Sequence, residues 1–214
     1  LETIGDSAFY ECPRLGEINI PDSVTTLGNS CFSGTSLREL TLPAGTTTIG
    51  NRAFAEMRYL RELHIPDTVT SLGIGVFAGD SALTTATLPS GLTEIPQSTF
   101  SFCEKLTSIE IPDGVTSIGK EAFQKCTSLT AVDLPDAVTS IGDRAFLNCQ
   151  SLTELRLPAE LETLGDRALC DCMGLTSLTV PDGVRELPDL VFSGCVSLTS
   201  LTLPAGLTSI GRGA

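Results

Sequence analysis

The chain has 214 residues, a formal net charge of −13 and a mean hydropathy of +0.21. Apolar residues make up 41% of the chain, which is enough to build a core and excludes wholesale disorder. Acidic residues outnumber basic ones 26 to 13, so the chain lacks the cationic surface that nucleic acids or anionic lipids require. No apolar run approaches the roughly 20 residues of a membrane span. The first residues do not form a signal peptide.

Prolines divide the chain into repeats. Nine of the twelve prolines are separated by 22 residues once and by 23 residues seven times. This periodicity predicts a single repeat array over residues 1–214, with partial units at both ends. The nine units cover residues 4–26, 27–48, 49–71, 72–94, 95–117, 118–140, 141–163, 164–186 and 187–209.

Apolar residues occupy fixed columns in these units. Leucine stands six residues before every one of the nine prolines, and eight of the nine phenylalanines in the chain share a second column, in which Leu169 fills the only gap. One unit is too short to bury its own core, but stacked units convert each column into a continuous ladder. The phenylalanines of the ladder are Phe9, Phe32, Phe54, Phe77, Phe100, Phe123, Phe146 and Phe192.

Each unit also predicts its own order of elements. The alternating segment that ends at proline is typical of a short parallel strand, and proline ends it because it cannot donate to the ladder. A turn and a second extended segment follow. Glycines such as Gly119 and Gly142 then indicate either a positive φ or a close backbone approach. The Asp or Asn that follows, as at Asp143, is expected to cap a short helical turn.

These columns are those of leucine-rich repeats, and the unit resembles the BspA-like (treponemal-type) subfamily. The segment LTSIEIPDGVTSIGKEAFQKC at residues 106–126 matches its pattern almost position for position. The resemblance implies a right-handed solenoid of nine coils, with parallel short strands on one side and short helical turns on the other. Members are mainly secreted or surface proteins of bacteria and some protists, associated with adhesion and protein contacts. An extracellular or cell-surface location is therefore expected.

Six cysteines form a third column, nine residues before the proline. A disulfide framework or a metal site is one interpretation, but Met57 replaces cysteine in this column and zinc-type pairs of closely spaced cysteines are missing. Buried free thiols are therefore favoured. Cys31 is interpreted as a small buried residue and Cys170 as an exposed one. The column contains Cys12, Cys103, Cys126, Cys149, Cys172 and Cys195.

No motif predicts catalysis or cofactor binding. The single histidine, His64, has no nucleophile motif beside it, and phosphate-binding glycine loops are missing. The recurring aspartates after proline are typical of turns rather than of a calcium site. The chain is therefore interpreted as a non-enzyme without metal or cofactor.

The outward positions of the proline-terminated strands are the candidate binding surface, because strand rows of curved solenoids commonly contact partners. A solvated face without a partner is the alternative. Exposed aromatic anchors are few: only Tyr10, Tyr59 and Phe102 lie outside the core ladders. The candidate strip consists of Arg38, Arg61, Glu62, His64, Glu110, Asp133, Glu154 and Arg156.

Three non-enzymatic functions follow from this interpretation. The first is an adhesion or protein-interaction module with a protein partner, and the second is a structural subunit of a larger assembly. The third is ice binding, suggested by a row of threonines that includes Thr25, Thr47 and Thr116. Neither end of the array has a polar cap, so we expect a fragment of a longer chain, or ends covered by partner chains or end-to-end contacts. Four positions are expected to be less buried than their internal counterparts: Ile4, Phe9, Leu207 and Ile210.

Overall fold

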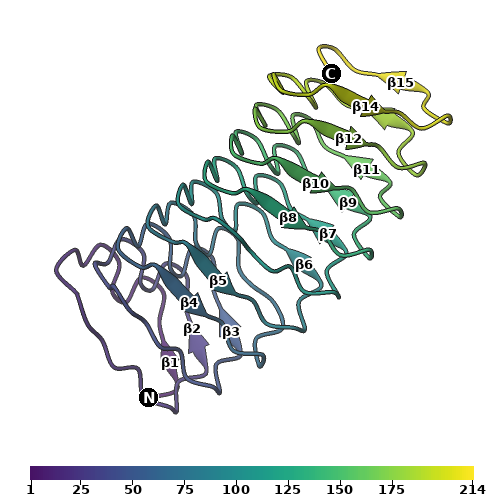
Figure 1. Ribbon diagram of the computed structural model, residues 1–214. Coiled ribbons are helices and arrows are strands. Elements are labelled where there is room, and N and C mark those ends of the chain that lie inside the picture. Colours follow the sequence, from purple (N-terminus) through teal and green to yellow (C-terminus); the bar gives the residue numbers. More distant parts are fainter.

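The computed structural model describes all residues 1–214 as one elongated solenoid, with the chain termini at opposite ends (Figure 1). Each repeat unit forms one coil, and the coils are numbered here from 1 (residues 4–26) to 9 (residues 187–209). All strand pairs are parallel and join neighbouring coils in a register of 22 or 23 residues, as in Leu63↔Ala86. The predicted repeat solenoid with parallel strands is therefore confirmed.

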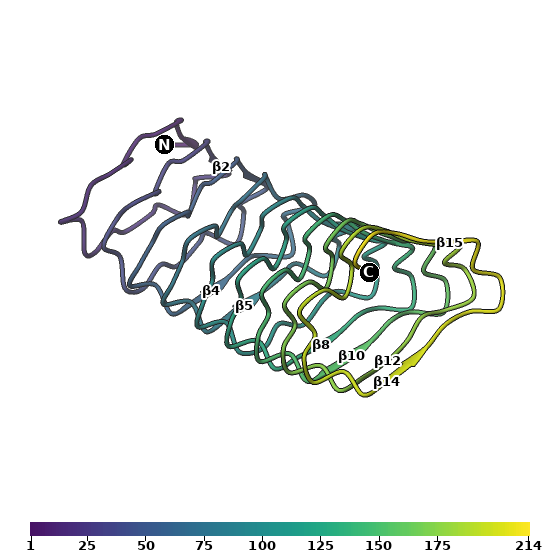
Figure 2. The ribbon, with the colours of Figure 1, turned by 90° about the horizontal axis from the view of Figure 1, so that it is seen from above.

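Strands form two rows on opposite sides of the stack (Figure 2). The short-strand face contains the first strand of the chain and the two-residue strands that follow the proline turns, except after Pro66, where Leu72 forms only an isolated bridge with Ile49. These are β1 (Thr3–Ile4), β2 (Thr26–Leu27), β3 (Thr48–Ile49), β6 (Glu94–Ile95), β7 (Ser117–Ile118), β9 (Ser140–Ile141), β11 (Thr163–Leu164), β13 (Glu186–Leu187) and β15 (Ser209–Ile210). The long-strand face contains the three-residue strands that precede proline. These are β4 (Glu62–His64), β5 (Thr85–Thr87), β8 (Ala131–Asp133), β10 (Glu154–Arg156), β12 (Ser177–Thr179) and β14 (Ser200–Thr202).

The third side of each coil contains no helix, so the prediction of short helical turns there is wrong. Two positions in each coil have a positive φ, as at Ser98 (57°) and Phe102 (63°), and a right-handed helix cannot include them. The backbone instead bonds between coils: the N–H groups of Ser98, Phe100 and Phe102 donate to carbonyls of coil 6 at 2.7–2.8 Å. Stacking thus satisfies the donors that a helix would have satisfied internally. We call this side, between the glycine column and the invariant leucine, the turn side.

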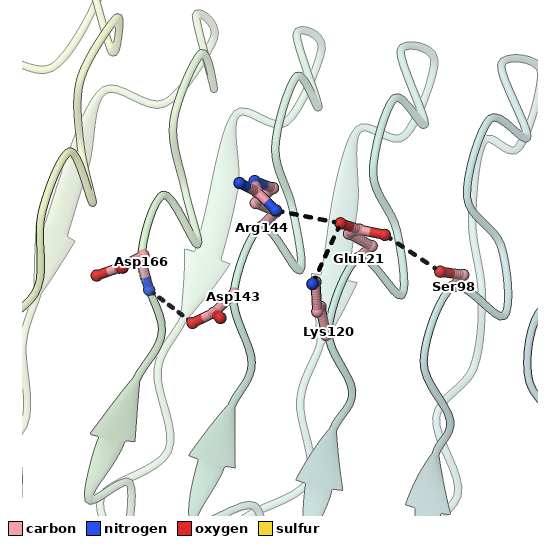
Figure 3. Close-up of polar contacts among 6 residues, drawn as sticks. All are labelled: Ser98, Lys120, Glu121, Asp143, Arg144 and Asp166. Carbon is pink, nitrogen blue, oxygen red and sulfur yellow. Dashed lines mark hydrogen bonds and ion pairs between the residues drawn. The ribbon is translucent and has the colours of Figure 1, made fainter.

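The Asp and Asn column links coils rather than capping helices. Asp143 Oδ1 accepts the backbone N–H of Asp166 at 3.0 Å, and Asp6 Oδ1 accepts that of Asn29 at 2.7 Å (Figure 3 shows the first pair). The glycine column, which precedes the Asp and Asn column, is needed because neighbouring backbones approach closely there. None of these glycines has a positive φ. A Cβ on Gly142 would lie 2.7 Å from the Lys120 nitrogen. The close-approach interpretation is therefore correct, and the N-cap interpretation is wrong.

The core is a stack of like residues. Consecutive phenylalanine rings from Phe9 to Phe146 lie 5.2–6.2 Å apart, centroid to centroid, with nearly parallel planes. Leu169 continues this ladder and is fully buried. At the ends, Phe9 and Leu207 are half-buried and Ile210 is exposed, as expected. Ile4 is still buried at 6% exposed, but it is less buried than every internal counterpart except Leu72 at 7%.

Thiols form a second internal ladder. The S–H group of Cys126 donates to the carbonyl of Phe100 at 3.2 Å, and Cys103, Cys149, Cys172 and Cys195 repeat this bond with the ladder residue 26 positions earlier. All eight cysteines are free. Burial raises the pKa of the Cys149 thiol to about 12. Cys31 is buried as predicted. Cys170 is also buried, contrary to prediction, and its thiol lies 3.6 Å from Asp171 Oδ2.

Candidate functional site

The eight candidate residues are all exposed, and six of them lie on the long-strand face. Glu62 and His64 flank Leu63 in β4, whose side chain points into the core. The same alternation exposes Asp133 in β8, and Glu154 and Arg156 in β10. The backbone of Glu110 forms an isolated parallel β-bridge with that of Asp133 in the neighbouring coil. The period of two in the sequence therefore placed these side chains correctly.

The two remaining candidates lie at the margin of this face. The guanidinium carbon of Arg38 lies 5.6 Å from the ring centroid of Tyr59, so Arg38 contacts an aromatic side chain of the next coil. The carbonyl of Arg61 accepts both the N–H and the hydroxyl of Thr84, at 2.8 and 3.0 Å. Most threonines that follow in this margin repeat the hydroxyl bond, as Thr107 does with Thr84. The threonine margin therefore stabilises the stack.

The ladder of the long-strand face is interrupted. Strand β4 pairs with β5, β8 with β10, and β12 with β14, whereas β5 does not pair with segment 108–110, nor β10 with β12. Open hollows lie at both of these interruptions. The hollow of about 710 Å³ between β5 and segment 108–112 contains Glu110 and Asp133, and that of about 720 Å³ between β10 and β12 contains Glu154 and Arg156.

Two further hollows extend the same face toward the N-terminus. Glu62 and His64 line one of about 310 Å³, and Arg38 lines one of about 630 Å³ in coils 1 and 2. The structure thus brings together three pairs of candidates: Glu62 with His64, Glu110 with Asp133, and Glu154 with Arg156. Arg61 lines none of these four hollows.

Ion pairing on this face is limited to one contact. Arg156 Nη2 lies 2.8 Å from Asp136 Oδ1 in the preceding coil, and this bond raises the pKa of Arg156. Asp67 accepts the N–H and the hydroxyl of Ser90, which lowers the pKa of Asp67. The sequence alone favoured only a turn role for both aspartates. Their positions in the sequence could have signalled that they lie close to this face. Each aspartate follows a proline directly and stands three residues after an outward strand residue of the same coil.

The turn side differs because its charges pair with each other. Glu121 accepts a hydrogen bond from Arg144 Nη1 at 3.3 Å and one from Ser98 Oγ at 3.4 Å, and Lys120 Nζ lies 3.9 Å from it (Figure 3). These contacts join coils 5, 6 and 7. The carboxylate of Glu121 is therefore engaged within the chain, unlike those of Glu110 and Asp133.

The threonine row proposed for ice binding also stabilises the stack. The hydroxyls of Thr47, Thr116 and Thr139 donate to backbone carbonyls of the preceding coil at 3.1–3.4 Å. Coil stacking therefore explains this row, and we do not propose ice binding. The structure contains no cluster of three or more metal-ligating side chains and no helix that could cross a membrane.

Stacked parallel strands, ladders of leucine and phenylalanine, and an exposed outward strand row define a leucine-rich repeat protein. The chain matches the family model of the BspA type leucine rich repeat region over residues 2–130 and 116–214. It therefore belongs to the BspA-type leucine-rich repeat family. Proteins of this fold generally serve as non-enzymatic interaction scaffolds.

Solved structures of bacterial relatives agree with this assignment. A leucine-rich repeat protein of Bacteroides ovatus is 26% identical with a TM-score of 0.68, and the match covers 100% of this chain and 68% of that one. A leucine rich cell surface protein of Faecalibacterium prausnitzii is 28% identical with a TM-score of 0.64, and coverage is 93% and 62%. The T. pallidum leucine rich repeat protein is 34% identical with a TM-score of 0.65, and coverage is 70% and 72%. The chain thus spans about two thirds of their lengths. No match was found among curated proteins.

Proposed function

We propose that the chain is a non-enzymatic protein-binding module, and that its partner docks on the long-strand face. One observation carries this proposal: exposed charges lie beside open hollows, and no ion pair within the chain neutralises Glu62, Glu110, Asp133 or Glu154. Folding does not require charges at these positions, because Thr85, Thr87 and Ser177 occupy the same outward rows in other coils. Exposed charged positions with no structural contact are suited to partner recognition.

The arrangement around His64 supports a role in binding rather than catalysis. A nucleophile would need a base within hydrogen-bond distance. The nearby hydroxyl of Ser90 donates instead to Asp67 at 3.0 Å. His64 is also solvent-exposed on β4, with no enclosed cavity around it.

Charge distribution indicates the partner's chemistry. The outward positions of coils 1 to 6 carry Glu17, Glu39, Glu62, Glu110 and Asp133, whereas those of coils 8 and 9 carry serine and threonine. We therefore expect a partner with basic groups facing the N-terminal two thirds of the face, since complementary charge steers association and selects partners. The name of the F. prausnitzii relative supports display at the cell surface.

Site-specific photo-crosslinking tests this proposal. A photoreactive residue at Thr87, on the long-strand face, is expected to capture a partner, whereas one at the exposed Thr70 is expected to capture much less. The double variant Glu110→Lys/Asp133→Lys should abolish capture, and the matched variant Glu186→Lys on β13 should retain it. Equal capture from both positions, or capture unchanged by the double reversal, would contradict the proposal. Stoichiometric copurification with a multi-chain assembly through the array ends would favour a structural subunit instead.

A further inference from the structure

Phe102 occupies a position that packing does not explain. It is 42% exposed, whereas the phenylalanines of coils 2 to 6 in the core ladder are fully buried. Its φ is +63°, a conformation that bulky side chains rarely adopt. The same turn-side row contains small or polar residues in neighbouring coils, such as Gly79, Lys125 and Asn148. Every coil has a positive φ in this row, so it is the exposed aromatic side chain, and not the backbone conformation, that points to a role other than folding.

Phe102 forms one wall of a notch on the turn side. Coil 4 has Gly79 at the position that Phe102 occupies in coil 5, so it lacks the side chain that would fill this space. The resulting hollow has a volume of about 470 Å³. Small-molecule sites commonly measure about 300–1,000 Å³. Lys125 of coil 6 lies 4.6 Å from the Phe102 ring centroid, whereas the notch lies toward coils 3 and 4.

Polar groups of both kinds line the rest of the notch. Coil 3 contributes Arg52, Glu56 and Arg58, and the two arginines lie 3.1 and 3.8 Å from the Glu56 carboxylate. Ser81 of coil 4 and Glu104 of coil 5 complete the polar rim. Two arginines and two glutamates balance in charge, so the notch selects neither a strong anion nor a strong cation.

We propose that this notch binds a pyranose ring of a glycan. A pyranose presents a patch of C–H groups on one ring face, which packs on an aromatic ring, and hydroxyls around its edge that both donate and accept. The Phe102 ring provides the apolar contact, Arg58 donates hydrogen bonds, and Glu104 accepts them. A neutral, polyhydroxylated ligand thus fits the balanced charge, the aromatic wall and the open shape of the notch. This site is separate from the long-strand face and does not depend on the function proposed for that face.

Saturation-transfer NMR on the whole chain tests the proposal. The probes are the methyl glycosides of glucose, galactose, mannose and N-acetylglucosamine, with N-acetyltyrosinamide as a peptide-like probe. We expect transfer to the ring C–H groups of at least one sugar. Phe102→Ala should weaken binding about fivefold through loss of the stacking contact. Arg58→Ala should weaken it by a similar factor through loss of a charged hydrogen bond.

Tyr59→Ala is the matched control, because Tyr59 is a similarly exposed aromatic residue outside the notch. It should leave sugar binding unchanged. Unaltered hydrogen-exchange protection of coils 3 to 6 will show that each variant is folded. Three results would overturn the proposal: no transfer to any sugar, equal transfer in Phe102→Ala and the unmodified chain, or binding of N-acetyltyrosinamide alone.

Discussion

The backbone N–H of Met57 donates a hydrogen bond of 2.8 Å to Oδ1 of Asp80, one coil further along. Both residues occupy the cysteine column, where the chain elsewhere places thiols. Asp80 is completely buried, and its second oxygen, Oδ2, has no hydrogen-bond partner. Burial raises the pKa of Asp80 well above its ordinary value, which favours the neutral carboxyl group in the folded chain.

Asp80 is expected to make stability depend on pH. Because its folded-state pKa is above the unfolded value of about 3.9, the unfolded state ionises first as pH rises. The free energy of unfolding should then fall by at most about 1.4 kcal/mol per pH unit until the folded-state pKa is reached. Asp80→Asn keeps the acceptor for Met57 and is neutral at every pH. Urea denaturation from pH 4 to 8 should show the variant gaining stability relative to the unmodified chain as pH rises; a constant difference would refute this.

The phenylalanine ladder should tolerate leucine but not alanine. Phe123 is fully buried between Phe100 and Phe146, with centroid distances of 5.4 and 5.2 Å. Phe123→Ala should lower the free energy of unfolding by about 3–5 kcal/mol, because a cavity remains. Phe123→Leu should cost much less, since Leu169 fills the same column without exposure. Denaturant unfolding measures both values, and equal losses would show that the column does not pack as a ladder.

Sequence periodicity predicted the parts of the fold that repeat. Proline spacing defined the coils, and period-two alternation placed Glu62, His64 and Asp133 on the exposed face. The turn side was mispredicted because Asp, Asn, Ala and Phe in sequence are equally compatible with a capped helix. Only stacking decides the outcome: the carboxylate of Asp143 bonds to the next coil, and Ser98 and Phe102 adopt a positive φ that their residue types do not signal.

Features that arise between coils were also hidden from the sequence. The hollow near Glu110 lies where β5 does not pair with segment 108–110, and no residue pattern marks that interruption. The notch beside Phe102 depends on Gly79, which stands at the same position in the preceding coil. The residue type in each column can be used to predict burial from the sequence. The hollows between neighbouring coils cannot be predicted in this way, because they depend on the spacing between the backbones.

Thiol reactivity should separate buried from partly buried cysteines. Burial raises the pKa of Cys31 and Cys149 to about 12, so almost no thiolate is present at neutral pH. In the native chain, a thiol reagent should react first with Cys12 and Cys195, which are only partly buried. All eight cysteines should react after denaturation without reductant. Mass spectrometry of the labelled sites measures this order, and fast native labelling of Cys126 would contradict it.

The glycine column provides a matched test of coil spacing. A Cβ on Gly142 would lie 2.7 Å from the backbone nitrogen of Lys120, and neither backbone can move without separating coils 6 and 7. Gly142→Ala should therefore lower the free energy of unfolding by about 2 kcal/mol or more, as overpacking in a closely packed interior does. Gly91 is the control, because it is exposed and a Cβ there would meet nothing within 4 Å. Gly91→Ala should change stability by less than about 1 kcal/mol, with a small gain from reduced freedom of the unfolded chain. Chemical denaturation measures both variants, and a similar small effect at both positions would show that close approach does not require glycine.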